Sequence, residues 1–297
     1  MLVPGPVGGG FVAHLRDRIG ALVHLDQRHG GLVAAPVALR AYREARDRLR
    51  AGGVRRGHGR DACSALAELG EVAGWSLSDA AAPRLAERVN REALGYARLA
   101  GDRGVELFLR QNTAMLAEWT GRPRESADLV GAVLETRLSP RLEALFRLRL
   151  AHASAQLGLD GQARRQLARA RGLYEDGVRD DDPPWSWWIN EAQLNWFEGA
   201  VHLRLGRAAS VEAFERAAEA VSEPRMDRNC RLWALYAHAV NRSWGDVDRL
   251  ARDLLPAGGI RSGLARARLD AALGALDRGR APGTVRELVS ALRARAQ

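Results

Sequence analysis

The chain has 297 residues, with 45 basic and 36 acidic side chains, a formal net charge of +9 and 46% apolar residues. All 45 basic residues are arginines, while isoleucine and threonine occur only three and four times. This apolar content excludes a wholly disordered chain, and the shortage of these two β-branched residues argues against a sheet protein. Because Ala, Leu, Arg and Glu enter helices at little cost, the composition predicts an all-α protein.

The positive charge alone is weak evidence for a nucleic-acid surface. Exclusive use of arginine is typical of a GC-rich genome, and a basic balance by itself promotes only nonspecific contacts. The densest basic stretch, residues 40–60, holds eight arginines against two acidic residues and spans the pair Gly52 and Gly53. We interpret it as the solvated face of a helix end.

The sequence predicts a cytoplasmic protein without a membrane partner. Cys63 and Cys230 lie far apart, with no metal-ligand or disulfide spacing, which fits a reducing compartment. No apolar stretch approaches the roughly 20 residues of a membrane span. Residues 1–10 are rich in Gly and Pro and lack the features of a signal peptide, so they are expected to form a flexible tail before a single domain over residues 11–297.

From residue 11 onward, helical periodicity alternates with short breaks of Gly, Pro, Asn and Asp. These breaks predict helices at residues 11–28, 33–51, 60–77, 82–100, 104–120, 123–137, 140–157, 161–176, 186–205, 208–221, 226–243, 245–255, 260–278 and 282–296. Helices of this length with short turns are typical of arrays of antiparallel hairpins.

Four of the turns share a glycine, at Gly121, Gly158, Gly206 and Gly245, spaced by 37, 48 and 39 residues. Glycine can end a helix in a left-handed cap, and proline can begin the next helix without losing a hydrogen bond. This pattern resembles the tetratricopeptide repeat. The resemblance implies a right-handed α-solenoid of helical hairpins, in which the first helix of each hairpin lines a concave groove.

A second resemblance covers most of the chain. It is carried by the segments LVHLDQRHGG (22–31), AELGEVAGW (67–75), NREAL (90–94), LAGDR (99–103) and GVRDDDP (177–183). These segments are similar to the C-terminal region of actinobacterial helix-turn-helix transcriptional regulators of the xenobiotic-response-element type. Because the resemblance starts near residue 11, the DNA-binding domain of that family is expected to be missing. Specific DNA binding by the chain alone is therefore not expected.

The repeat resemblance places a set of candidate ligand-binding residues on the first helices of the hairpins. Amides can hold both a donor and an acceptor of a peptide backbone, and arginine can hold a carboxylate. The candidate residues are Gln111, Asn112, Arg149, His152, Gln193, Trp196, Arg204 and Tyr236. Replacing Asn112 or Arg149 by alanine is expected to weaken a partner without unfolding the protein.

The function predicted from these patterns is a noncatalytic regulatory or adaptor protein that binds a peptide or protein in the groove. A transcriptional regulator is one such partner. The sequence leaves open whether the chain forms a homodimer. The alternative is a small-molecule sensor or an enzyme that uses a pocket lined by Trp188 and Trp196. The run from Trp185 to Trp188, predicted to open a helix, either fills space between repeats or anchors a ligand.

Motifs for catalysis, cofactors or metals are weak. No nucleophile, phosphate-loop or zinc-protease motif is present, so neither an enzyme nor a cofactor is expected. His24, Asp26 and His29 are interpreted as capping or hydrogen-bonding residues, and the acidic run at 180–182 as a loop cluster. An apparent helix-turn-helix at 68–90 would place Pro83 inside its second helix at a cost of roughly 3 kcal/mol, so a repeat hairpin is preferred there.

Overall fold

A computed structural model describes residues 7–257 and 261–295. In these two ranges it contains fourteen α-helices, two short 3-10 helices and no strand other than an isolated bridge between Val7 and Val54. The all-α prediction is confirmed, and each of the fourteen predicted segments corresponds to one α-helix. No helix in the described part of the chain is long and apolar enough to cross a bilayer.

The chain divides into two compact units, whereas the sequence predicted one domain over residues 11–297. Unit 1 comprises Met1–Leu116 with the short segment Arg261–Leu264, and unit 2 comprises Ala117–Ile260 and Ala265–Gln297. The chain therefore leaves unit 1, builds most of unit 2, and returns four residues to unit 1 before unit 2 is completed.

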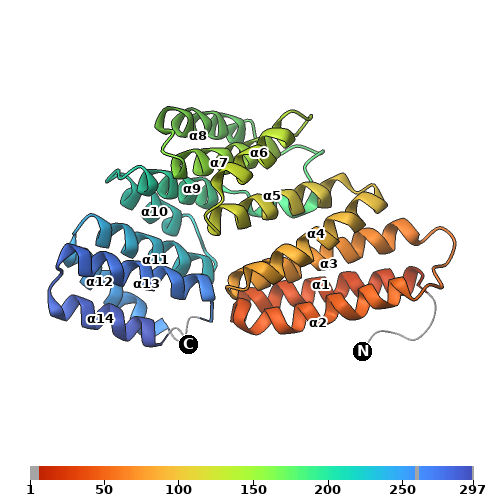
Figure 1. Ribbon diagram of the computed structural model, residues 1–297, viewed down its shortest axis with the longest axis horizontal. Helices are drawn as coiled ribbons and strands as arrows, with labels where there is room; N and C mark the ends of the chain where they lie inside the picture. The colour runs from red at the N-terminus through yellow and green to blue at the C-terminus, as the bar shows by residue number, and fades with distance from the viewer. Residues whose placement is uncertain (1–6, 258–260, 296–297) are drawn as a thin grey trace. The chain divides into compact units, whose positions relative to one another are not determined.

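In unit 1, neighbouring helices pack side by side (Figure 1). Its helices are α1 (Gly9–His29), α2 (Gly31–Arg50), α3 (Gly59–Asp79), α4 (Pro83–Ala100) and most of α5 (Arg103–Trp119). Helix α3 contacts α1, α2 and α4. The core between these helices contains Leu15, Tyr42 and Leu66, which are fully buried.

Unit 2 begins with the end of α5. It continues with α6 (Pro123–Leu134), α7 (Pro140–Gln156), α8 (Asp160–Glu175), η1 (Pro184–Trp188), α9 (Glu191–Arg204), α10 (Ser210–Glu219), α11 (Pro224–Val240), α12 (Trp244–Leu254), η2 (Leu255–Ala257), α13 (Gly263–Gly279) and α14 (Gly283–Ala294). Consecutive helices from α6 to α12 contact each other. In addition, α7 packs on α9 and α12 packs on α14 (Figure 1). Alternate helices therefore meet as well as consecutive ones.

Three of the four predicted glycine turns have the expected backbone conformation. Gly121, Gly158 and Gly206 adopt φ values of 76°, 75° and 67°, the left-handed region that glycine enters without strain. Gly245 instead lies in the first turn of α12. The left-handed position in that turn is taken by Arg242, with a φ of 60°.

The predicted helix at 186–205 starts later than expected. A 3-10 helix holds the tryptophan run, and α9 begins only after Asn190, whose Oδ1 accepts a hydrogen bond from the Gln193 backbone N–H at 3.0 Å. Asparagine is a strong N-cap, so it sets the helix start. Trp185 and Trp188 stack on each other with ring centres 6.3 Å apart, and Trp187 between them is 63% exposed.

Ordered structure begins before residue 11. Val7 is buried, its backbone N–H donates to Gly53 at 3.1 Å, and its carbonyl accepts from Arg55 at 2.8 Å. Helix α1 follows from Gly9. The expected tail thus retains residues 1–6 at most, and these lie outside the described residues.

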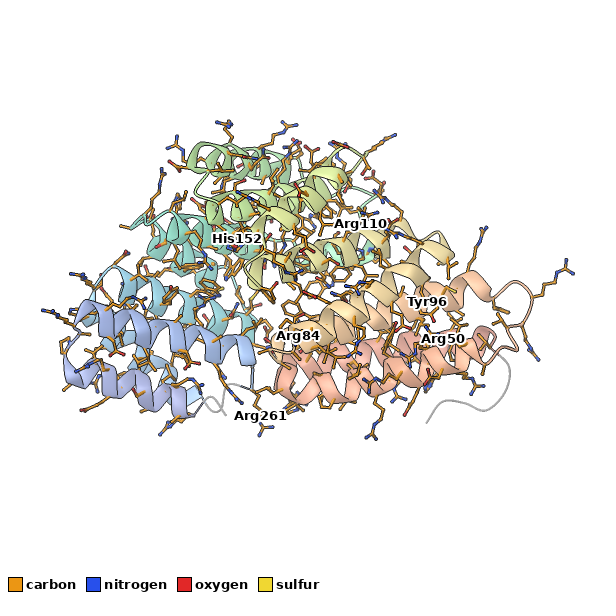
Figure 2. All side chains as sticks on the ribbon, in the orientation of Figure 1. Arg50, Arg84, Tyr96, Arg110, His152 and Arg261 are labelled. Atoms are coloured by element: carbon orange, nitrogen blue, oxygen red, sulfur yellow. The ribbon has the colours of Figure 1, made fainter. Side chains whose placement is uncertain are left out.

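Two features of unit 1 that could suggest DNA binding, the basic stretch at 40–60 and the apparent helix-turn-helix at 68–90, have structural explanations. In the 40–60 stretch, Arg50 donates from Nε to the Tyr96 hydroxyl at 3.2 Å and also pairs with Glu92 on α4 (Figure 2). In the 68–90 segment, Gly74 lies inside α3 and Pro83 begins α4, so no helix-turn-helix turn forms at Gly74. Helices α3 and α4 pack on each other as consecutive helices.

Candidate functional site

The candidate site in unit 2 is a row of touching side chains on alternate helices, α5, α7, α9, α11 and α13. We call it the polar–aromatic row, and it consists of Glu118, Arg149, His152, Trp196, Phe197, Trp233, Tyr236 and Arg268. Helices α5, α7, α9 and α11 correspond to segments predicted to be the first helices of hairpins. The row changes from buried and ion-paired at one end to partly exposed and cationic at the other.

The buried end is built around the carboxylate of Glu118, whose side chain is fully buried. One oxygen, Oε2, lies 2.7 Å from Nδ1 of His152 and 3.4 Å from Nη1 of Arg149, and the other accepts from Ser126 Oγ at 2.9 Å. Burial lowers the pKa of Arg149, and the negative charge of Glu118 opposes that shift. The carboxylate therefore compensates a guanidinium that would otherwise be costly to bury.

Aromatic rings continue the row. Arg149 lies over the ring of Phe197 at 4.9 Å, and Phe197 packs edge-to-face on Trp196 with centres 5.1 Å apart. Trp196 also contacts Trp233 edge-to-face at 5.3 Å. The ring of His152 lies 6.3 Å from that of Trp196. Edge-to-face geometry is the favoured arrangement of aromatic quadrupoles, so these rings join α7, α9 and α11 in one defined packing.

The other end of the row is cationic. The guanidinium carbon of Arg268 lies 3.1 Å from the ring centre of Trp233 and 5.1 Å from that of Tyr236. Burial lowers the pKa of Arg268 to about 9, and the nearby positive charge of Arg204 acts in the same direction. Tyr236 and Arg268 are partly exposed and Arg204 is exposed, so this end of the row can be reached from solvent.

An open hollow of about 400 Å³ adjoins the row. Its walls come from α5, α6, α7 and α9 and include Glu118, Trp119, Gln156 and Arg204. Since a small ligand site commonly has a volume of roughly 300–1,000 Å³, the hollow is large enough for a side chain or a small molecule. Arg204 connects the hollow with the cationic end of the row.

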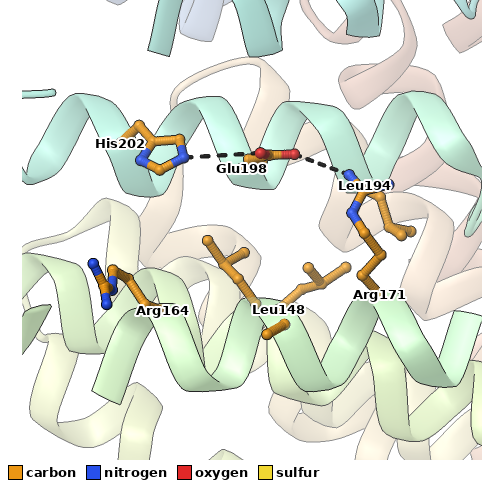
Figure 3. A pocket seen from close by; sticks show the side chains of 8 residues that line it. Leu148, Arg164, Arg171, Leu194, Glu198 and His202 are labelled. Atoms are coloured by element: carbon orange, nitrogen blue, oxygen red, sulfur yellow. Dashed lines mark hydrogen bonds and ion pairs between the residues drawn. The ribbon is translucent and has the colours of Figure 1, made fainter. Parts of the chain in front are cut away.

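A second, smaller hollow of about 210 Å³ lies between α7, α8 and α9 (Figure 3). Its carboxylate, Glu198, is flanked by Arg171 at 2.9 Å and His202 at 3.8 Å. The hydrogen bond from His202, with the charges of Arg171 and Arg216, lowers the pKa of Glu198 to about 2. The negative charge of Glu198 is therefore already compensated by residues of the fold. This hollow is a weaker candidate for a ligand site for that reason.

The structure brings four of the predicted ligand-binding residues together, since Arg149, His152, Trp196 and Tyr236 all belong to the row. Arg204 lies beside it. The side chain of His152 sits on α7 within unit 2 (Figure 2). Arg149, His152 and Trp196 are 3%, 2% and 6% exposed, so they build the floor of the site and do not form an open groove surface. Gln193, also buried, lies in the first turn of α9.

The remaining two predicted residues, Gln111 and Asn112, lie in unit 1. Both are buried, and Gln111 Nε2 donates to Asn112 Oδ1. Asn112 Nδ2 in turn donates to Glu71 Oε1 at 2.7 Å. Burial raises the pKa of Glu71 to about 8, although the bond from Asn112 opposes the shift. The hydrogen bonds of Gln111 and Asn112 thus connect residues inside unit 1.

Four members of the row, Glu118, Phe197, Trp233 and Arg268, are not among the candidate residues predicted from the sequence, although Phe197 directly follows the candidate Trp196. Glu118, Trp233 and Arg268 have ordinary helical spacing. The contacts of Glu118 with Arg149, of Trp233 with Trp196 and of Arg268 with Trp233 each join residues 31 or more positions apart in the chain. Trp233 carried the best available signal, because a tryptophan next to predicted groove residues of α11 is a frequent recognition residue. Nothing in the local sequence distinguishes Arg268 from the other arginines.

Two acidic residues considered for metal binding, Asp26 and Asp182, take part in hydrogen bonds, and the described part of the chain holds no group of three or more His, Cys, Asp or Glu side chains suited to a metal ion. Asp26 is buried and accepts a hydrogen bond from Trp75 Nε1 at 3.1 Å, whereas His24 and His29 are exposed. In the acidic loop, Asp182 accepts from the Arg179 backbone N–H at 2.9 Å and from Ser139 Oγ. Hydrogen bonds therefore account for both aspartates.

Comparison of the sequence with protein-family models found no match, and comparison with curated proteins found none either.

Proposed function

We propose that the protein is a noncatalytic regulatory or adaptor protein, and that it binds a peptide or protein along the first helices of the hairpins in unit 2. The observation that carries this proposal is the polar–aromatic row, in which alternate helices contribute one continuous series of contacting side chains. Helical-repeat proteins commonly bind partners on the surface formed by equivalent helices. The proposal includes a solenoid arrangement of tetratricopeptide-like hairpins and a role in transcriptional regulation.

The exposed end of the row supplies the recognition chemistry. Arg204 and Arg268 offer planar donor groups, while the partly exposed Tyr236 offers aromatic surface. Arginine and aromatic residues dominate the energetics of recognition sites because they combine large contact area with directed hydrogen bonds. The buried end, around Glu118, holds the helices in place so that the exposed residues are preorganised.

The alternative, a small-molecule sensor or enzyme with a pocket lined by Trp188 and Trp196, has less support. Trp188 stacks on Trp185, and Trp196 packs against His152, Phe197 and Trp233. Neither tryptophan lines either of the two hollows described above.

Selection from a random peptide library against the purified chain tests the proposal. Peptides that bind would be measured by fluorescence anisotropy with wild type, Arg204→Ala and Arg252→Ala. Arg252 is a matched control, because it is an exposed arginine on α12, a second helix of its hairpin. We expect roughly tenfold weaker binding by Arg204→Ala and unchanged binding by Arg252→Ala. Equal binding by all three proteins, or no selected peptide, would refute the assignment.

A further inference from the structure

We propose that the cationic end of the polar–aromatic row is a site for a phosphate monoester carried by the ligand. The site consists of Arg268 and Arg204, with Trp233, Tyr236 and Trp196 around them. The inference rests on the proposed function in that it names the chemistry of one part of the same binding surface.

Two buried donors at Trp233 have no hydrogen-bond partner among the described residues. One is Nε of Arg268, whose guanidinium lies over the Trp233 ring, and the other is Nε1 of Trp196, whose ring packs edge-to-face against it. Buried donors are almost always paired in proteins, so an unpaired one needs an explanation. Two such donors on one indole indicate that an acceptor is expected from outside the chain.

The charges at the site are also uncompensated. In the described part of the chain, neither Arg268 nor Arg204 has a carboxylate within 4.0 Å. Two other arginines of unit 2 do have acidic partners, as Arg149 pairs with Glu118 and Arg171 with Glu198. Because like charges repel, two neighbouring cations favour binding of an anion with two negative charges. A phosphate monoester carries a charge of about −1.5 to −2 at neutral pH.

The orientation of Arg268 suits this role. Stacking on an indole uses the flat face of a guanidinium. Its N–H groups lie in the plane of the group and stay available for an oxyanion, which they can bind in pairs. Tyr236, which is partly exposed, supplies apolar surface for the part of the ligand that carries the phosphate. The site therefore combines positive charge, directed hydrogen-bond donors and apolar surface.

Titration with small anions tests the site without requiring the unknown partner. Intrinsic tryptophan fluorescence would follow binding of inorganic phosphate, O-phosphoserine, serine and succinate at matched ionic strength. We expect saturable binding of both phosphates, with serine inactive and succinate weaker. Stronger binding of O-phosphoserine than of inorganic phosphate would assign the site to a phosphorylated side chain, and the reverse order to a free phosphate. Selective binding of succinate would overturn the phosphate assignment.

Variants separate the site from general effects of charge. Arg268→Gln and Arg204→Gln should each weaken phosphate binding roughly tenfold or more, because each removes a charge-assisted interaction. Arg252→Gln changes the net charge equally and should bind as wild type does. Arg204 is exposed, so Arg204→Gln keeps the test valid if Arg268→Gln lowers the helical circular dichroism signal. The proposal would be overturned if Arg204→Gln bound phosphate as well as wild type does, or if Arg252→Gln lost phosphate binding to the same extent. Neither outcome would refute peptide binding, which the peptide-library experiment tests separately.

Discussion

Asp79 and Ser262 are separated by 183 residues, and Ser262 Oγ donates a hydrogen bond to Asp79 Oδ1 at 2.7 Å. The other carboxylate oxygen accepts from the Gly31 backbone N–H, also at 2.7 Å. One buried carboxylate at the end of α3 thus joins the start of α2 and the returning segment Arg261–Leu264. The fit is tight, because a Cβ on Gly31 would lie 2.6 Å from the carbonyl oxygen of Ser76 and one on Gly263 would lie 2.6 Å from Ala81 Cβ.

Asp79→Ala is expected to lower the free energy of unfolding by about 1–3 kcal/mol, because it removes the acceptor of two buried hydrogen bonds, from the Gly31 backbone N–H and from Ser262 Oγ. Ser262→Ala removes one bond of the pair and should cost about 1 kcal/mol. Urea denaturation followed by circular dichroism measures both changes. Ser222→Ala, at an exposed serine, is the control and should be neutral. If Asp79→Ala unfolds at the same urea concentration as wild type, the carboxylate does not hold the segment.

Glu118→Ala should destabilise unit 2 by about 3–5 kcal/mol, since it leaves the buried guanidinium of Arg149 without its carboxylate. Arg149→Ala should be costly for the same reason, contrary to the sequence-based expectation that it would spare the fold. Thermal unfolding of both single variants and of the double variant gives the coupling between them. We expect the double variant to lose less than the sum of the two single losses, and strict additivity would contradict the pairing.

Glu71 should make stability depend on pH. Its pKa is about 8 in the folded chain and near 4.5 when unfolded, so the folded state keeps a proton that the unfolded state loses between these values. The free energy of unfolding therefore falls as pH rises from about 4.5 to 8, by on the order of 1–4 kcal/mol, and is highest at the acid end of this window. Glu68 and Asp26 add negative charge nearby and act in the same direction.

Glu71→Gln provides the test, because a neutral amide can still accept the bond from Asn112. Urea denaturation at pH 5 and pH 9 should show similar stability of variant and wild type at the lower pH, and a more stable variant at the higher pH. Parallel pH dependences of the two proteins would show that Glu71 does not hold the proton.

Two glycines should respond in opposite directions to substitution. Gly158 has a φ of 75°, so Gly158→Ala should cost about 1 kcal/mol and Gly158→Val more. Gly172 lies in the exposed interior of α8, and a Cβ there would meet no atom within 4 Å. Gly172→Ala should therefore stabilise the protein by roughly 0.5–1 kcal/mol. Thermal denaturation compares the two. An unchanged or more stable Gly158→Ala would contradict the left-handed cap, and a loss of stability in Gly172→Ala would contradict the open helix position.

Local patterns were sufficient to locate the helices. Composition and turn residues predicted all fourteen, and the left-handed caps at Gly121, Gly158 and Gly206 followed from glycine alone, because helix propensity and capping act within a few residues of the chain. The late start of α9 also had a local cause in Asn190. It was missed because the tryptophan run looked equally suited to begin a helix.

Of the candidate site, the sequence alone placed Arg149, His152, Trp196, Arg204 and Tyr236 on first helices through the repeat spacing. It could not predict that Arg149 and His152 would be buried against Glu118, or that Arg268 would lie on Trp233. These contacts join residues on different helices, and helical periodicity says which face a residue occupies without saying what packs against it. Burial and charge compensation depend on that packing, so only the tertiary structure decided which arginines are paired inside the fold and which keep donors free for a ligand.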